Sequence, residues 1–344
     1  MTAYVKRVQD QTPTKLWVNN PLPEEVEEAL AFDVFGATTN PTYLSKLMKA
    51  GDQGLRECMG EFVKKEPDDD RVMEELQKAM IKRLAEKLLP LFRASNGQKG
   101  FVAIQGNPHY DRDADYIYEE ALRYFEAAPN IIVKMPGTQA GHEAFERLVA
   151  ENKPLIVTQG FTMAQSDSIF QAYRRASLGS GYQPPMFMTT LTGIFDQFTA
   201  EYTKKHHISV TPEVLSQAGC LISHRVYQYW KEKHAAGVLM GGGARGIQHF
   251  TEMVGGAMHV TVNYSFIEEL NELNLDISNK MDAKPGDEVV WELLEKLPYF
   301  RQAWEVDAQR REDFENYEPF LYFESSFLEA WDLVQEELRA ERRG

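Results

Sequence analysis

Eight short apolar runs alternate with stretches of helical hydrophobic period over most of this chain. Each run ends in small or polar residues, which is typical of buried strands that helices connect into a parallel sheet. Eight such alternations favour a closed (β/α)8 barrel over an open sheet. The predicted strands are 15–20, 35–40, 101–107, 131–136, 155–160, 186–192, 238–243 and 259–263.

Two segments depart from this alternation. The second connection, about residues 44–95, is too long for one crossover helix and contains a strongly helical stretch, so we expect an inserted helical segment there. After the eighth run, apolar and aromatic residues continue in helical and irregular spacing. The sequence thus predicts a single α/β domain, a TIM barrel at 1–275 with this insertion, and a C-terminal helical appendage at 276–344 packed on the barrel. Other helices are expected at 24–31, 114–127, 142–150, 163–176, 221–234 and 246–254.

Composition excludes several classes of protein. The 344 residues include 37 Lys and Arg against 52 Asp and Glu, a net charge of −15, which argues against nucleic-acid partners and anionic membrane surfaces. No apolar stretch is long enough to span a bilayer, and no signal region opens the chain. The two cysteines, Cys58 and Cys220, lack metal-ligand spacing. We expect a cytoplasmic protein without a metal or a cofactor, and the sequence leaves both a monomer and a homo-oligomer open.

Lys134 lies within the apolar run of residues 130–136, where a buried strand would end. Desolvation disfavours the charged form of an amine and can lower its pKa by several units, leaving a nucleophile that attacks carbonyl groups. A Schiff-base enzyme needs such an amine. Taken alone, Lys134 is better explained as a side chain that extends to water or pairs with an acid, and it is the rest of the chain that favours the nucleophile.

Other polar residues fall at the predicted strand ends. In a barrel, side chains at the carboxyl ends of the strands point into a common site. Each of these residues is also common in turns and caps, so their joint placement carries the argument. They are Asn19, Asn40, Gln105, Lys134, Thr158, Thr189 and Arg245.

Four of these residues belong to motifs that follow one another along the chain. The motifs are Gly-Ala-Thr-Thr-Asn-Pro at 36–41, Asn-Ile-Ile-Val-Lys-Met-Pro-Gly-Thr at 130–138, Val-Thr-Gln-Gly-Phe-Thr-Met-Ala-Gln at 157–165, Met-Gly-Gly-Gly-Ala-Arg at 240–245 and Val-Thr-Val at 260–262. In this order they resemble the motifs of the transaldolase family, which includes the smaller fructose-6-phosphate aldolases. The resemblance runs from about residue 15 to residue 270.

The resemblance implies a class I aldol mechanism on a (β/α)8 barrel. Lys134 matches the lysine that forms an imine with the donor ketose, and the imine takes up electrons when the C3–C4 bond breaks. Asn40 matches the residue that hydrogen-bonds donor hydroxyls, and Thr158 matches the one that helps to hold the catalytic water. Arg245 matches an arginine that grips a substrate phosphate, a role that suits its fork of donors. Thr189 opens the sixth-strand motif and is expected to bind substrate.

The chain departs from the family at its acid–base positions. Asn19 stands where the family usually has an aspartate, and Gln105 stands where transaldolases have a glutamate. An amide orients water or a hydroxyl but exchanges no proton near neutral pH. Fructose-6-phosphate aldolases also have a glutamine at the position of Gln105. His109 and Tyr110, in the loop after the third run, are candidate proton relays, as is Tyr264.

The phosphate side departs as well. Ile194 replaces a common arginine, and Gly243 replaces a serine, although Gly243 can give the substrate close access to backbone NH groups. With Arg245 as the remaining basic group, we expect weaker phosphate binding.

The sequence therefore predicts a Schiff-base enzyme that cleaves or transfers a ketol unit of a sugar or sugar phosphate. Two alternatives remain open at this stage. One is a catalytically silent homologue that binds a carbonyl metabolite or a partner protein. The other is a lysine-dependent lyase whose Arg245 binds an acidic substrate.

Overall fold

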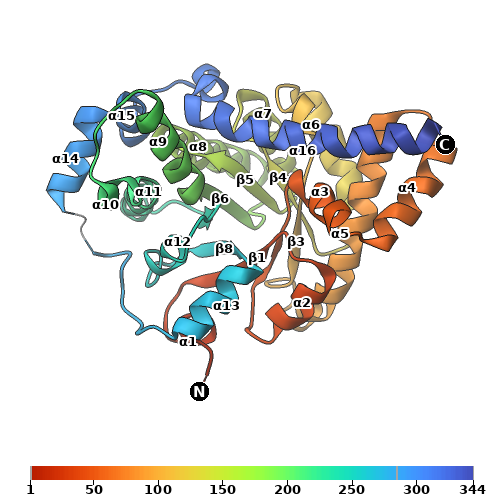
Figure 1. Cartoon of the computed structure of the whole chain (residues 1–344), viewed down its shortest axis with the longest axis horizontal. Coiled ribbons are helices and arrows are strands. Elements are labelled where there is room, and N and C mark those ends of the chain that lie inside the picture. Colours follow the sequence, from red (N-terminus) through yellow and green to blue (C-terminus); the bar gives the residue numbers. More distant parts are fainter. Residues whose placement is uncertain (1, 284–285, 344) are drawn as a thin grey trace.

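The computed structural model describes residues 2–283 and 286–343 and shows a closed barrel of eight parallel strands surrounded by helices (Figure 1). Each strand pairs in parallel with the next, and β1 pairs with β8 to close the barrel. The predicted (β/α)8 architecture is therefore confirmed. The strands are β1 Lys15–Asn19, β2 Gly36–Thr38, β3 Phe101–Gln105, β4 Ile131–Met135, β5 Leu155–Gly160, β6 Met186–Leu191, β7 Val238–Gly242 and β8 His259–Asn263.

Helices occupy the connections and both ends of the chain. Within the described residues, no helix is long and apolar enough to cross a membrane. The helices are α1 Tyr4–Gln11, α2 Pro23–Leu30, α3 Thr42–Lys49, α4 Gln53–Lys65, α5 Asp69–Ala94, η1 Pro108–Tyr110, α6 Ala114–Phe125, α7 Gln139–Ala150, α8 Met163–Ser180, α9 Thr192–Lys205, α10 Pro212–Leu215, α11 Ala218–Lys233, α12 Gln248–Thr251, α13 Tyr264–Leu273, α14 Asp287–Lys296, α15 Pro298–Trp304, η2 Arg311–Asn316 and α16 Glu318–Arg343.

The strands are buried on both faces, as expected when helices surround a parallel sheet. Side chains alternate between the helices and the barrel interior. An interior cluster fills the barrel below the strand ends, so the barrel is a packed core and its open space lies at the mouth. The buried members of this cluster are Trp17, Phe101, Ala103, Ile132, Ile156, Phe187 and Met240.

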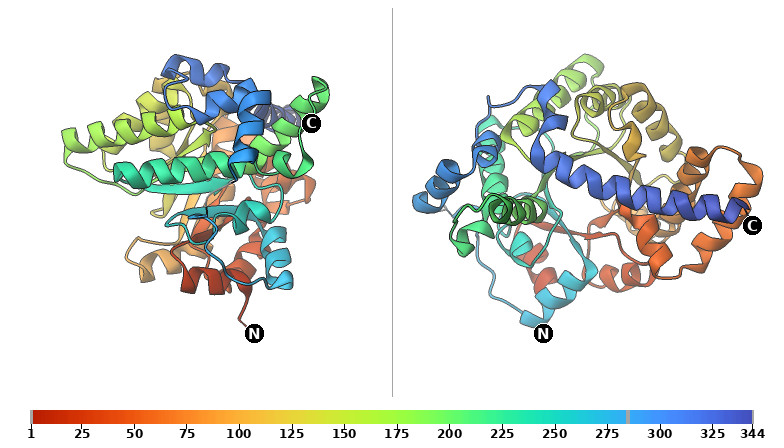
Figure 2. Two further views of the ribbon diagram at one scale, coloured as in Figure 1. Left: turned by 90° about the vertical axis from the view of Figure 1, so that its left-hand side faces the viewer. Right: turned by 45° about the horizontal axis from the view of Figure 1, so that its top comes forward.

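The segments outside the alternation are helical, and they meet one another. The long second connection contains α3, α4 and α5, and α16 ends the chain. Figure 2 shows α16 lying across one end of the barrel and reaching α4. Arg339 and Arg342 of α16 both pair with Asp69 at the start of α5. Phe323 of α16 packs edge-on against Phe161, which follows β5.

One predicted helix is much shorter than expected. The period at 246–254 predicts a helix, but only α12, Gln248–Thr251, is α-helical there. Its N-cap residue, Ile247, supplies no side-chain hydrogen bond, and Gly255 follows with a positive φ of 95°. The rest of this segment forms turns that connect β7 to β8.

Trp17 fills the centre of the barrel interior. Its ring is fully buried, lies 5.3 Å from Phe35 and 5.4 Å from Phe187 between centroids, and its Nε1 donates to His259 Nδ1 at 2.8 Å. Burial lowers the pKa of His259 to about 3, so the ring is neutral and its Nδ1 can accept this bond.

Replacing Trp17 therefore tests the packing of the interior. We expect Trp17→Ala to reduce the free energy of unfolding by about 3 to 5 kcal/mol, since it leaves a large cavity and an unpaired His259 nitrogen. Trp291→Ala is the matched control, because Trp291 is 67% exposed. It should change the free energy by less than about 0.5 kcal/mol. Urea unfolding measures both, and equal losses would contradict the assignment of Trp17 to the core.

Candidate active site

A cavity of about 430 Å³ opens at the carboxyl ends of the strands. Its wall is made of residues from β1, β2, β4 to β8 and α16, so segments from the whole length of the chain meet there. Gln105 is the one predicted site residue that is not among the described lining residues. The predicted residues that line the cavity are Asn19, Asn40, Lys134, Thr158, Thr189, Gly243 and Arg245.

Lys134 is buried at this cavity, with 8% of its surface exposed. Its Nζ donates one hydrogen bond, to the backbone carbonyl of Thr39 at 3.1 Å. Within the described part of the chain it makes no ion pair. Burial lowers the pKa of Lys134 to about 7, and no charged neighbour opposes this effect. A substantial fraction of the amine is therefore neutral at physiological pH.

Gln105 lies beside Lys134 in the sheet, since the two residues are register partners of β3 and β4. Only 1% of Gln105 is exposed, and neither its Oε1 nor its Nε2 has a hydrogen-bond partner among the described residues. Thr189 Oγ1, on β6, is buried and unpartnered in the same way. Buried polar atoms without partners are costly, and in a binding site they indicate groups that bind water or ligand.

Asn19 belongs to a chain of amides and hydroxyls across the ends of β1, β2 and β8. Its Oδ1 accepts from Thr38 Oγ1 at 3.1 Å, and its Nδ2 donates to Asn263 Oδ1 at 2.9 Å. Thr38 and Thr261 share a hydroxyl contact of 2.6 Å. Both polar ends of the Asn19 amide are therefore held by neighbours, and its orientation is fixed.

Asn40 is oriented by its own short network. Its Oδ1 accepts from Asn20 Nδ2 at 3.1 Å, from Thr42 N at 3.0 Å and from Thr42 Oγ1 at 2.6 Å. No hydrogen bond within the described residues uses its Nδ2. The fixed amide thus presents two N–H donors, which suits hydroxyl oxygens of a substrate.

Arg245 supplies the positive charge on the opposite wall, after β7. Its Nε donates to Gln197 Oε1 at 2.7 Å and its Nη1 to the carbonyl of Ala244 at 3.2 Å. Burial lowers the pKa of its guanidinium, and among the described residues it pairs with no acidic side chain. An arginine bound only to neutral groups at a cavity wall can bind an anion.

Ile194 and Gly243, the two departures on this wall, lie against each other. A Cβ added at Gly243 would lie 2.6 Å from Ile194 Cγ1, and Gly243 has a positive φ of 66°. Both the contact and the backbone conformation disfavour a side chain at Gly243 while Ile194 is present. Ile194 and Gly243 therefore fit each other, and they form an apolar part of the wall that Arg245 also lines.

The sequence reasoning missed several lining residues. Glu25 of α2 and Lys46 of α3 line the cavity and form an ion pair of 3.1 Å, and Lys46 Nζ also donates to the carbonyl of Asn20 at 2.7 Å. Phe323, Ser326 and Phe327 of α16 line it from the C-terminal end of the chain. Helical period placed these residues on helices, but only the tertiary arrangement brings them to the mouth of the barrel.

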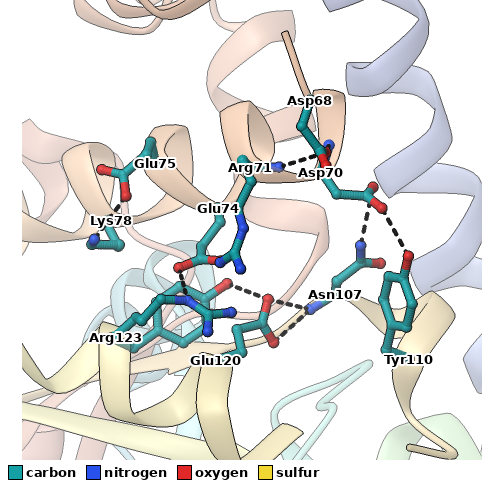
Figure 3. Close-up of polar contacts among 11 residues, drawn as sticks. Asp68, Asp70, Arg71, Glu74, Glu75, Lys78, Asn107, Tyr110, Glu120 and Arg123 are labelled. Atoms are coloured by element: carbon teal, nitrogen blue, oxygen red, sulfur yellow. Dashed lines mark hydrogen bonds and ion pairs between the residues drawn. The ribbon is translucent and has the colours of Figure 1, made fainter. Parts of the chain in front are cut away.

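The loop after Gln105 is held by the side chains of Glu120, which is buried, and Asp70, which is partly buried (Figure 3). Both oxygens of Glu120 accept from Asn107 N at 3.2 Å, and a Cβ at Gly106 would lie 1.9 Å from Glu120 Oε2. Burial raises the pKa of Glu120 to about 8. Tyr110 donates to Asp70 at 3.0 Å.

Of the three candidate proton relays, only Tyr264 is a described lining residue of the cavity. His109 pairs with Asp332 of α16 at 2.6 Å, and neither His109 nor Tyr110 is a described lining residue of the cavity. Tyr264 does line it. No described group of three or more His, Cys, Asp or Glu is arranged to hold a metal ion.

Comparison with known proteins gives a consistent family assignment. The family described as transaldolase/fructose-6-phosphate aldolase matches residues 16–310. A transaldolase of Thiobacillus denitrificans is 33% identical over 41% of this chain and 40% of its own length. Transaldolases of Neisseria meningitidis serogroup A and Mycobacterium ulcerans are 28% and 26% identical over 44% and 41% of this chain and 43% and 38% of their own lengths.

The aligned stretches thus span about two-fifths of each of these relatives. The family match itself covers the whole barrel, from β1 to β8, and extends into the C-terminal helices. Together with the closed barrel of parallel strands, it shows that this chain belongs to the transaldolase/fructose-6-phosphate aldolase family.

Proposed function

We propose that this protein is a Schiff-base enzyme that cleaves or transfers a ketol unit of a sugar or sugar phosphate. The observation that carries the proposal is the Lys134 amine, buried at the cavity without a counter-charge and with its pKa lowered to about 7. The surrounding amides and hydroxyls suit a polyhydroxylated ligand, and Arg245 suits a phosphate at the far end of that ligand.

The chemistry follows from the amine. Neutral Lys134 attacks the donor carbonyl, water leaves, and a protonated imine forms. When the C3–C4 bond breaks, its electron pair moves into this imine and gives an enamine, while the C4 hydroxyl loses its proton and becomes an aldehyde. Asn40 would hydrogen-bond donor hydroxyls, and Thr158, Thr189 and Gln105 would bind the water and the hydroxyls next to the imine.

Proton transfer takes place here without a carboxylate at the two usual positions. Asn19 and Gln105 orient their partners but exchange no protons. Of the described lining residues, Glu25 alone carries a carboxylate, and Lys46 and the backbone N–H of Leu22 both donate to it. Water held by the Gln105 and Thr158 side chains would therefore carry the proton to and from the reacting oxygen.

Trapping with borohydride tests the covalent step. In the presence of a panel of ketoses, reduction should add the mass of a donor fragment to the peptide that contains Lys134, and Lys134→Met should abolish the adduct. Lys46→Met is the matched control, because Lys46 lines the same cavity but is paired with Glu25. It should leave the adduct in place.

The same experiment separates the alternatives. Absence of any adduct in the wild type would support a catalytically silent homologue. An adduct formed with keto acids but not with ketoses would support a lyase on an acidic substrate. An adduct on another lysine would overturn the assignment of Lys134.

The pKa of Lys134 predicts how trapping depends on pH. Because this pKa is about 7 rather than 10.5, the neutral fraction of the amine should rise roughly tenfold between pH 6 and pH 8 and then level off. The measurement is the initial rate of dihydroxyacetone trapping with cyanoborohydride from pH 6 to 10. A rate that keeps rising tenfold per pH unit to pH 10 would indicate an ordinary, solvated lysine.

Arg245 predicts the strength of anion binding. A hydrogen bond to a charged group contributes roughly 1.5 to 3 kcal/mol, so Arg245→Ala should weaken the affinity for inorganic phosphate about tenfold to a hundredfold. Ile194→Arg should strengthen it, because it adds a second guanidinium beside Gly243. Calorimetric titration of the three proteins measures this, and phosphate affinity that survives Arg245→Ala would assign the anion to another basic residue.

A further inference from the structure

A buried Asp–His pair lies directly behind the wall that carries Arg245. Asp196 of α9 and His249 of α12 are 8% and 1% exposed, and neither is a described lining residue of the cavity at Lys134. They line a separate hollow of about 350 Å³, and Arg245 lines both spaces. The pair is therefore placed to act on Arg245 without touching a ligand in the active-site cavity.

The contacts of the pair converge on the backbone of Arg245. Asp196 Oδ2 lies 2.9 Å from His249 Nε2, and Asp196 Oδ1 accepts from Gly219 N at 2.7 Å. On the other side of the ring, the backbone N–H of Arg245 donates to His249 Nδ1 at 3.2 Å. The Asp196 carboxylate, the His249 imidazole and the backbone amide of Arg245 thus form a continuous chain of hydrogen bonds.

The contact with Arg245 favours one tautomer of His249. Nδ1 can accept from the Arg245 N–H only if it carries a lone pair, and in that tautomer the ring proton is on Nε2 and is donated to Asp196. Burial raises the pKa of Asp196, and the hydrogen bond from His249 opposes that rise. With the proton on Nδ1 instead, the ring would face the Arg245 N–H with another N–H and could bond only to the carbonyl of Gly246, 3.2 Å away.

The residue after Asp196 holds the other end of the same arginine. Gln197 Oε1 accepts from Arg245 Nε at 2.7 Å. The backbone is packed equally closely, since a Cβ at Gly193 would lie 2.5 Å from both Arg245 N and the carbonyl oxygen of Gly243. One turn of α9 and its neighbours thus determine where the main chain and the guanidinium of Arg245 lie.

We propose that Asp196 and His249 are positioning residues for the anion site: they hold the backbone of Arg245 so that its guanidinium faces the phosphate end of the substrate. The inference rests on the proposed function, because it deepens the role of Arg245 in that site. Because Ile194, which lines the same wall, carries no charge, the placement of Arg245 decides the affinity. A purely structural pair would affect stability without selecting between phosphorylated and unphosphorylated ligands.

Isosteric variants test this selectivity. Asp196→Asn replaces the acceptor of the Nε2 proton by an amide that can donate, which favours the His249 tautomer with its proton on Nδ1. His249→Leu removes the acceptor of the Arg245 N–H, whereas His249→Asn retains an amide oxygen near the Nδ1 position. His224→Leu is the matched control, since His224 is 9% exposed and bonds to the carbonyl of Glu252 away from Arg245.

The measurements are the calorimetric affinity for inorganic phosphate and the rate of trapping with unphosphorylated dihydroxyacetone. We expect Asp196→Asn and His249→Leu to weaken phosphate binding about tenfold, approaching Arg245→Ala, with trapping changed less than twofold. His249→Asn should recover most of the affinity, and His224→Leu should retain all of it. With a phosphorylated ketose, the loss should appear in KM rather than in kcat.

Several results would overturn the proposal. One is phosphate affinity unchanged from the wild type in both Asp196→Asn and His249→Leu. Another is a loss of trapping as large as the loss of phosphate affinity. The third is phosphate binding by the wild-type protein that does not depend on Arg245. The last result removes the anion site itself. Failure of the Schiff-base function is distinguished by the absence of wild-type trapping, which the phosphate titration does not require.

Discussion

The site depends on a lysine amine that the barrel buries without a negative partner. A closed barrel of parallel strands brings all its carboxyl ends to one mouth, so Lys134 is surrounded by strand ends from every side. A carboxylate next to the amine would favour the ammonium form and raise its pKa. The amides Asn19 and Gln105 provide hydrogen-bonding capacity without that charge. The lowered pKa of Lys134 accordingly follows from burial alone.

Ile194 and Gly243 show how one side chain constrains its neighbour in the cavity wall. Ile194 occupies the space that a side chain at Gly243 would need, and the positive φ of Gly243 is tolerated because glycine has no Cβ. In the proposed function, recognition of a negative group is left to Arg245, whose guanidinium bonds to neutral acceptors. An apolar wall beside one arginine favours a ligand with a smaller or less charged end than a wall with two arginines.

The barrel and most of its site could be predicted because both arise from local patterns. Apolar runs that end in polar residues locate the strands, and their carboxyl ends identify Lys134, Asn40, Thr158 and Arg245 without knowledge of the packing. Glu25, Lys46 and the α16 residues could not be predicted in this way, since helical period gives the face of a helix but not which part of a barrel it covers. The Asp196–His249 pair depends on a contact between α9 and α12, and the sequence between them contains no signal for it. The local period also overestimates α12, because it does not register the missing side-chain cap at Ile247 or the positive φ of Gly255.

The run of acids Asp68 to Asp70 illustrates what tertiary structure adds, because each acid has a separate role. Asp68 caps α5 by accepting from Asp70 N and Arg71 N, Asp69 binds Arg339 and Arg342 of α16, and Asp70 accepts from Tyr110 and from Gln335. Exposed ion pairs are individually weak, but several on one helix act together. Since α16 also provides Phe323, Ser326 and Phe327 to the cavity, these ion pairs help to hold one wall of the cavity in place.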